Sequence, residues 1–312
     1  MCCNDCQIDC RKFGKRGNRQ RYQCSQCRKV FTDARDNTLE GMYLPVEKAE
    51  MVLKMMLEGN SISSIERVTE VHHTTILKLL LLAGEKAERI MATRIVNVQV
   101  RDVELDEAWS FIQKKEKHVR PGDDPMFGDC YVHVALERHS KLAINIVVGK
   151  RDQVSTDTLI EGLRTATRGT FQVTSDGWSA YRSAVTTTLH DRISGFAQLI
   201  KVYRTPQDSE KRYSPAEVQS VEVVPVYGQP DPERICTSIV ERSNLTLRTG
   251  LRRFTRLTCA FSRKFEYHAA AVMLWYCWYN FGRVHKSIRM TPAMAANVSD
   301  HIWSVRELLE AA

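Results

Sequence analysis

The chain has 312 residues, of which 43% are hydrophobic and 26% are charged, and its formal net charge is +8 at pH 7. This composition excludes a disordered or fibrous chain, and the length allows two or three domains with a sizeable core. No stretch approaches the ~18 uninterrupted apolar residues of a membrane span, and the first residues lack the apolar core of a signal peptide.

Residues 1–35 are predicted to form a small zinc-binding unit. Two Cys-x2-Cys pairs, separated by 17 residues, supply four thiols from Cys3, Cys6, Cys24 and Cys27. Four thiolates on two facing turns suit one structural Zn²⁺ ion, whose binding would fold a segment that is too small for a core of its own. Cys2 and Cys10 are further thiols that could replace a member of the first pair.

A basic stretch with interleaved aromatic residues connects the two cysteine pairs. Eight basic residues and no acidic one lie between Arg11 and Lys29. This composition suits contacts with DNA phosphates, for which we single out Arg19 and Arg21. A solvated face, or a docking surface for another protein, is the alternative.

Residues 44–95 are predicted to form a helix-turn-helix. A first helix begins after Pro45 and stops at Gly59. Ser61 caps a short second helix, and a longer third helix begins near His72. Helices of this size and order are typical of a DNA reader, in which the leading turn of the third helix meets the DNA. That turn presents His73, Thr74, Thr75 and Lys78. The alternative is a plain helical linker.

After these helices the sequence pattern changes to that of strands. Apolar and polar residues alternate over 103–111 and then over two further segments, which predicts three strands. An amphipathic helix follows at about 155–167, and two more strands end at Asp176 and near residue 203. Strands mixed with helices predict an α/β domain with a mixed sheet over residues 98–290.

The C-terminal third is predicted to be mainly helical. Residues 204–235 contain five prolines and few helix signals, which predicts an inserted loop or small hairpin. A helix that contains Glu241 follows, and then an apolar helix at 265–281, which we expect to be buried. Residues 291–312 are predicted to form a helical tail.

Three carboxylates occupy positions where catalysis could be built. Asp106 lies within the first strand, Asp176 at the tip of the fourth, and Glu241 near the start of a helix. If the first and fourth strands are neighbours, the three side chains converge. Glu107 would point to the opposite face of the strand, so we expect it to be a poorer ligand. The alternative is that all three are ordinary surface acids.

Converging carboxylates repel one another in a low dielectric unless cations bind between them. Oxygen ligands in an incomplete protein shell suit Mg²⁺ or Mn²⁺. Two such ions could activate a water or hydroxyl group and stabilise the leaving oxygen in a phosphoryl displacement.

The segment after Glu241 is basic, with seven basic residues and no acidic one up to residue 264. On an ideal helix, Arg248 and Arg252 lie within about 20° of the face of Glu241, and Asn244 lies about 60° away. We therefore expect Glu241 to bind metal and these three side chains to contact DNA beside the cut.

Several of these segments resemble motifs of IS1-like insertion-sequence transposases of the DDE class. They are LDEAWSF (105–111), SDGWSAY (175–181) and TSIVERSNLTLRTGLRRFTRLTCAFSRK (237–264). The opening CCNDCQIDCRKFGKRGNRQRYQCSQCRKVFTD (2–33) is similar to the zinc-ribbon head of that family. YNFGRVHKSIRMTPAMAA (279–296) is similar to a tail shared by many DDE transposases. The resemblance covers essentially the whole chain.

The resemblance implies a ribonuclease-H-like catalytic domain behind a zinc ribbon and a helix-turn-helix. By position, Asp106 and Asp176 match the two catalytic aspartates and Glu241 matches the glutamate. The implied activity is metal-dependent cleavage at insertion-sequence terminal repeats, followed by attack of the freed 3′-hydroxyl on target DNA. The implied cofactors are two Mg²⁺ or Mn²⁺ ions and one structural Zn²⁺ ion. Arg28 stands where the family often has glycine, and the stretch 117–127 is shortened.

The expected partners are double-stranded DNA, as transposon ends and target, and a second copy of the chain, because two ends must be paired. We expect a cytoplasmic protein associated with the nucleoid, with no membrane partner and no small-molecule substrate. Two alternatives remain: a DNA-binding regulator with an inactive sheet domain, and a ribonuclease-H-type nuclease without strand transfer. A regulator would have no need of the three carboxylates.

Overall fold

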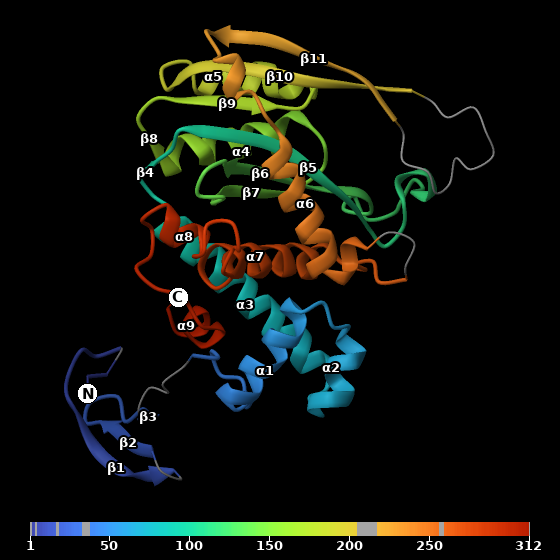
Figure 1. Ribbon diagram of the computed structural model, residues 1–312. Helices are drawn as coiled ribbons and strands as arrows, with labels where there is room; N and C mark the ends of the chain where they lie inside the picture. Colours follow the sequence, from blue (N-terminus) through green and yellow to red (C-terminus); the bar gives the residue numbers. More distant parts are fainter. Residues whose placement is uncertain are drawn as a thin grey trace. The chain divides into compact units, whose positions relative to one another are not determined.

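The computed structural model describes residues 2–3, 5–16, 19–32, 38–204, 217–255 and 259–311. The chain divides into two compact units, Met1–Leu44 and Pro45–Ala312, and each is described by itself (Figure 1).

The smaller unit contains a three-stranded antiparallel sheet in the order β1-β2-β3. Its strands are β1 (Cys10–Arg16), β2 (Arg19–Cys24) and β3 (Val30–Thr32). β2 is the central strand and pairs with both neighbours. The cysteine pairs lie in turns beside these strands, one before β1 and one between β2 and β3.

Three helices open the larger unit, as the sequence predicts. They are α1 (Val46–Leu57), α2 (Ile62–Thr69) and α3 (His73–Arg94). The Ser61 hydroxyl accepts a hydrogen bond from the Ser64 N–H and so caps α2, and the His72 side chain caps α3. α3 packs against α7 (Phe265–Phe281), so these helices belong to the same compact unit as the sheet. The finer division into 44–95, 98–290 and 291–312 stays a prediction.

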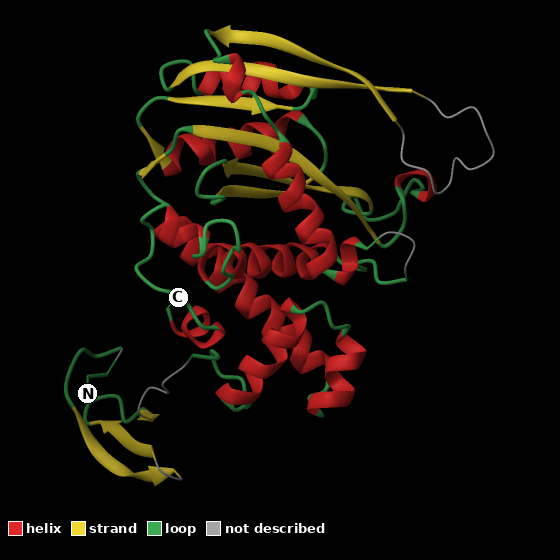
Figure 2. Cartoon of the chain, viewed as in Figure 1, coloured by secondary structure: helices red, strands yellow, loops and turns green. Residues whose placement is uncertain are grey.

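A six-stranded mixed sheet forms the centre of the larger unit, in the order β11-β10-β9-β5-β6-β7 (Figure 2). Its strands are β5 (Asp102–Ile112), β6 (Gly128–Glu137), β7 (Ala143–Gly149), β9 (Phe171–Ser175), β10 (Ile193–Arg204) and β11 (Glu217–Gly228). β5, β6 and β7 are antiparallel neighbours, whereas β9 lies parallel to both β5 and β10. The first and fourth predicted strands, β5 and β9, are therefore neighbours, with Leu105 opposite Ser175. A separate two-stranded ladder joins β4 (Val98–Gln99) to β8 (Thr167–Arg168).

The inserted segment 204–235 adds an edge strand to this sheet. β11 pairs antiparallel with β10 over most of its length, so the hairpin is longer than the sequence predicts. Residues 205–216 of the insertion lie outside the described residues.

Helices cover both faces of the sheet. α4 (Gln153–Ala166) packs on β6 and β7 and against α5 (Ala180–Thr188), while α6 (Ser238–Gly250) crosses the other face over β5 (Figure 1). Most residues of α7 are buried, and Trp275 and Tyr276 are inaccessible to solvent, which confirms the predicted core helix. The remaining short helices are η1 (Glu116–His118), η2 (Pro232–Arg234), η3 (Arg252–Phe254), α8 (Pro292–Ala295) and α9 (Val305–Glu310). In the described part of the chain, none of the helices combines the length and apolar character needed to cross a membrane.

Candidate functional site

A cleft of about 630 Å³ lies where β5, the end of β9 and α6 meet. Its lining includes all three predicted carboxylates, Asp106, Asp176 and Glu241. Because β5 and β9 are adjacent parallel strands and α6 crosses β5, residues more than 60 positions apart in the sequence reach the same cleft. The three side chains therefore line one cleft, as expected if these two strands are neighbours.

The aspartates are held by hydrogen bonds from neighbouring elements. The side chain of Asn244, on α6, donates to Asp106 Oδ2 over 2.8 Å. Asp176 is the first residue after β9, and its Oδ1 accepts a hydrogen bond of 3.0 Å from the Trp178 backbone N–H. Its Oδ2 accepts a second bond, of 3.2 Å, from Arg151. Both carboxylates are thus oriented before any ligand arrives.

Glu241 lies in the first turn of α6. Its Oε1 accepts a hydrogen bond of 2.7 Å from the hydroxyl of Thr237, the residue that precedes the helix, and also forms an ion pair with Lys201. The Glu241 side chain is 42% exposed, so it forms the solvent-facing wall of the cleft. Its negative charge nevertheless raises the pKa of both Asp106 and Asp176, although burial raises each of them more.

Glu107 lies closer to the two aspartates than its place on the strand predicts. Ligand oxygens of Asp106, Glu107 and Asp176 lie within 4.8 Å of one another, so Glu107 belongs to the tightest carboxylate group, whereas Glu241 lines the same cleft outside that group. Strand alternation does place Asp106 and Glu107 on opposite faces. Asp176, however, lies beyond the end of its strand and can meet both of them. Arg151 bridges Glu107 and Asp176, because its guanidinium donates to Glu107 Oε2 over 3.1 Å and also to Asp176 Oδ2.

Burial and mutual repulsion make this group electrostatically costly. Burial, followed by the charge of Asp176, raises the pKa of Asp106 to about 6 and that of Glu107 to about 7. The pKa of Asp176 is also raised, mainly by burial. Such a group favours any cation that can enter it. Its donors are all carboxylate oxygens, which are the ligands that Mg²⁺ and Mn²⁺ prefer. The residues therefore fit the cations that the sequence predicts.

The cleft is also lined by two basic side chains, Arg151 and Lys201, which the sequence analysis did not single out. Arg151 lies in the connection between β7 and α4, and its guanidinium stacks on Trp178 at 4.3 Å from the ring centroid. Lys201 projects from β10 toward Glu241. Both contacts depend on tertiary packing, and neither residue stands in a motif that could have identified it.

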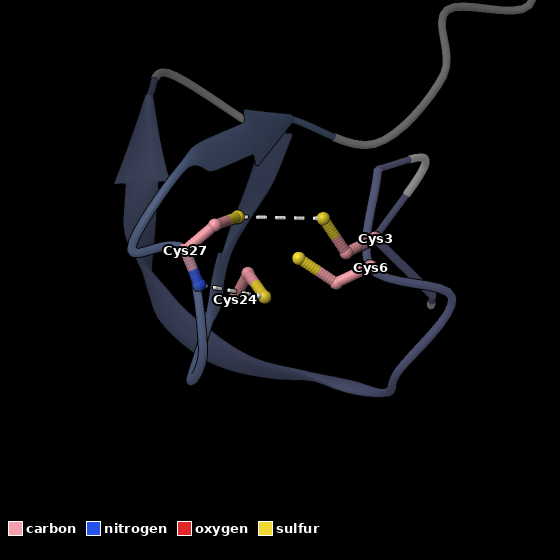
Figure 3. Close-up of side chains that lie close together, drawn as sticks. All are labelled: Cys3, Cys6, Cys24 and Cys27. Carbon is pink, nitrogen blue, oxygen red and sulfur yellow. Dashed lines mark hydrogen bonds between the residues drawn. The ribbon is translucent and has the colours of Figure 1, made fainter.

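The four predicted zinc ligands also converge, in the smaller unit (Figure 3). Their sulfur atoms lie within 4.8 Å of one another. The sulfurs of Cys3 and Cys27 are 3.6 Å apart, close to the roughly 3.8 Å between ligands of a tetrahedral site with Zn–S bonds of about 2.3 Å. Backbone N–H groups of Cys27 and Gln26 lower the pKa of Cys24 to about 6 and so favour its thiolate. The group fits a structural zinc ion.

Backbone geometry explains why both turns present their thiols in the same way. The residue after each pair, Gln7 or Arg28, has a positive φ, of 56° and 59° respectively. Arg28 thus adopts the conformation for which glycine is favoured. Of the two spare thiols, Cys2 contacts the Asp9 carboxylate, and Cys10 contacts the Ile8 carbonyl and also lies beside Cys24.

The predicted DNA contacts on the third helix lie at its exposed leading end. His73, Thr74 and Lys78 are exposed, and Thr75 is half-buried. Glu66 Oε1 accepts hydrogen bonds from both the backbone N–H and Nδ1 of His73, at 2.8 and 3.0 Å, which fixes the start of α3.

The other predicted contacts are more widely distributed. Arg21 is half-buried, with its guanidinium over the Phe13 ring, and the side chain of Arg19 lies outside the described part. Arg248 lines the carboxylate cleft. The expectation that Arg252 shares the helical face of Glu241 is wrong, because α6 ends at Gly250 and Arg252 lies in η3. Asn244 is buried against Asp106, which leaves its side chain little surface for the predicted contact with DNA.

No protein-family model and no curated protein matches the chain. Among solved structures, the chain is similar to the piggyBac transposase in a synaptic complex with hairpin DNA, with a TM-score of 0.37 and 10% identity over 87% of this chain and 72% of that one. It is also similar to the Mos1 strand transfer complex (TM-score 0.20, 14% identity, 48% of this chain and 57% of that one). The Mos1 transposase paired-end complex is similar to the same extent, with a TM-score of 0.19 and 14% identity over 48% of this chain and 58% of that one.

Proposed function

We propose that the protein is an IS1-like DDE transposase, which binds insertion-sequence terminal repeats, cleaves a DNA strand there and transfers the freed 3′-hydroxyl to target DNA. One observation carries the proposal. Asp106, Asp176 and Glu241 enter a single cleft from β5, from the end of β9 and from α6. Bringing carboxylates together in a partly buried cleft costs folding free energy, and a protein that only binds DNA would have no reason to retain such a cluster.

The sheet supports the ribonuclease-H-like part of the proposal. Its first strand, β5, lies between the second strand, β6, and the fourth strand, β9. The antiparallel strands β5, β6 and β7 are extended on the β5 side by β9 and β10, which are parallel to β5. This order brings the middle of β5 and the end of β9 to one side of the sheet, where α6 supplies the third carboxylate.

Asp106, Asp176 and Glu241 would hold two Mg²⁺ or Mn²⁺ ions, which when bound supply an activated water or hydroxyl and stabilise charge on the phosphate. The chain itself orients the ligands. Asn244 holds Asp106, and the Trp178 N–H holds Asp176. Arg248, on the wall of the cleft, would contact a phosphate next to the reacting one.

The remaining parts of the chain would bind the ends of the element. The smaller unit would carry one structural Zn²⁺ ion on its four cysteines, and its basic strands would track the DNA backbone. The leading turn of α3 would enter a groove. Two ends must be joined in one reaction, so we expect two copies of the chain on double-stranded DNA.

A nicking assay tests the proposal. Purified protein is incubated with Mg²⁺ or Mn²⁺ and supercoiled plasmid that carries candidate terminal repeats. The Asp176→Ala variant should lose roughly 100-fold or more of the nicking activity, since a ligand is removed. Asp191→Asn is the matched control, because Asp191 pairs with Arg164 on the surface, outside the cleft. Equal nicking by wild type and Asp176→Ala would remove the assignment.

A further inference from the structure

A fourth acidic residue, Glu104, connects the strand of Asp106 to the helix of Glu241. The Glu104 side chain is buried, with 1% of the residue exposed. Its Oε2 accepts hydrogen bonds from the backbone N–H groups of Ile239 and Val240, at 2.9 and 2.8 Å. These are N–H groups of the first turn of α6, which have no partner within the helix. A carboxylate from a distant strand thus caps this helix.

Glu104 is the central member of a row of three carboxylates on one face of β5. Asp102, Glu104 and Asp106 alternate along the strand and therefore point to the same side. Each contacts the segment that leads into and forms α6. Asp102 accepts a hydrogen bond of 2.8 Å from Arg234 Nε, and Asp106 accepts one of 2.8 Å from Asn244. Only the contact made by Glu104 is to the backbone at the helix start.

This arrangement is costly to keep. Glu104 Oε1 is buried and has no hydrogen-bond partner among the described residues, and Arg138 Nε lies 3.9 Å from it. Burying a carboxylate with one oxygen unpaired lowers the stability of the fold. An apolar residue at this position would avoid that cost, but it would leave two N–H groups at the start of α6 without acceptors.

We propose that Glu104 is a positioning residue, which fixes the first turn of α6 and thereby sets the carboxylate of Glu241 over the cleft. Glu241 follows Val240 directly, so two hydrogen bonds to one oxygen restrain both the rotation and the translation of the turn that carries it. The proposal rests on the proposed function, in which Glu241 binds a divalent cation.

The first test measures the helix start itself. Hydrogen exchange is followed by mass spectrometry on the whole protein, in peptides that cover residues 237–242. In Glu104→Ala the amides of Ile239 and Val240 should exchange about tenfold faster or more, because the cap is lost. Glu104→Gln retains an acceptor oxygen and should restore most of the protection.

Asp102→Asn is the control, because Asp102 contacts Arg234 and not α6. If Glu104→Ala fails to fold, Glu104→Asp replaces it, since the shorter side chain keeps the charge but not the reach. Unchanged exchange in the folded variant would overturn the proposal.

The second test measures the effect on Glu241. Mn²⁺ affinity is determined for wild type, Glu241→Gln, Glu104→Ala and the double variant, with Glu104→Asp again in reserve. Glu241→Gln should weaken binding about tenfold in wild type and less than about twofold when Glu104 is changed, since coupled residues are not additive. Equal losses in both backgrounds would overturn the positioning role. If Glu241→Gln has no effect in wild type, the proposed function fails for Glu241, whereas the exchange measurement still decides whether Glu104 holds the helix.

Discussion

The side-chain N–H of Asn244 lies 2.8 Å from Asp106 Oδ2, so helix α6 is bonded directly to the carboxylate at the centre of β5. Asn244 is buried, and its Oδ1 has no hydrogen-bond partner among the described residues. The residue that precedes it by three, Glu241, lies on the wall of the same cleft. The helix therefore contributes one acidic side chain to the site and one amide that orients another.

Loss of this amide should impair cleavage more than DNA binding. Asn244→Ala removes the hydrogen bond that orients Asp106, so we expect nicking to fall about tenfold or more. DNA affinity should stay within about twofold of wild type, because a buried side chain contributes little phosphate contact. Gel-shift and nicking assays on the same preparation check both values. Arg248→Ala is the comparison, and it should weaken DNA binding. An Asn244→Ala protein that loses DNA affinity but cleaves bound DNA normally would contradict this role.

The raised pKa values predict how stability depends on pH. Asp106 and Glu107 have folded-state pKa values of about 6 and about 7, above the roughly 4 expected when unfolded. At these two sites the folded state therefore binds more protons than the unfolded chain between about pH 4 and pH 7, so the stability that these two carboxyl groups contribute falls as pH rises through this range. Asp106→Asn should stabilise the metal-free protein at pH 8, by on the order of 2 kcal/mol, and have little effect at pH 4. Urea unfolding in EDTA at both pH values measures this. If Asp106→Asn is less stable than wild type at pH 8, the claim that the Asp106 charge destabilises the metal-free fold is contradicted.

Arg151 should balance the negative charge of the two carboxylates that it contacts, Glu107 and Asp176. Its guanidinium bridges Glu107, whose side chain is 3% exposed, and Asp176. Arg151→Ala leaves a buried carboxylate without its cation, so we expect a loss of about 2–4 kcal/mol in metal-free protein at pH 8. Arg164→Ala removes an exposed ion pair with Asp191 and should cost less than about 1 kcal/mol. Chemical unfolding compares the two. If the two variants lose similar free energies of unfolding, Arg151 stabilises the fold no more than an exposed ion pair does, which would contradict this prediction.

The smaller unit should contain one zinc ion per chain. Metal analysis of purified protein should find about one equivalent, and Cys24→Ser should lose it together with the fold of residues 2–32, because metal binding supplies the folding energy. Cys10→Ser is the control, since the Cys10 sulfur contacts the Ile8 carbonyl and lies outside the four-thiol group. Zinc content that is unchanged in Cys24→Ser, or lost in Cys10→Ser, would contradict the ligand set.

Local sequence pattern predicted the features that depend on local structure. Alternation located β5, and the apolar composition of 265–281 located the buried helix. The predicted cap at Ser61 located the start of α2, and the helical pattern after His72 located the start of α3. Convergence of the carboxylates required the first and fourth strands to be neighbours, and the pairing of β5 with β9 meets that condition.

Features that depend on where elements end, or on distant partners, could not be predicted in this way. The proximity of Glu107 to Asp176 was not predicted, because alternation within one strand does not describe Asp176, which lies past the end of another. Arg252 was placed by extending a helix that in fact stops at Gly250. Arg151 and Lys201 reach the carboxylates only through tertiary packing, and no local pattern marks them.

The most direct measurement of the central claim is the anomalous scattering of Mn²⁺ in crystals of the protein with an end oligonucleotide. The account predicts a Mn²⁺ peak within about 2.2 Å of carboxylate oxygens from both Asp106 and Asp176, with Glu241 facing it across the cleft and the DNA strand alongside. A cleft without a Mn²⁺ peak at saturating metal, with Arg151 still bridging Glu107 and Asp176, would contradict it.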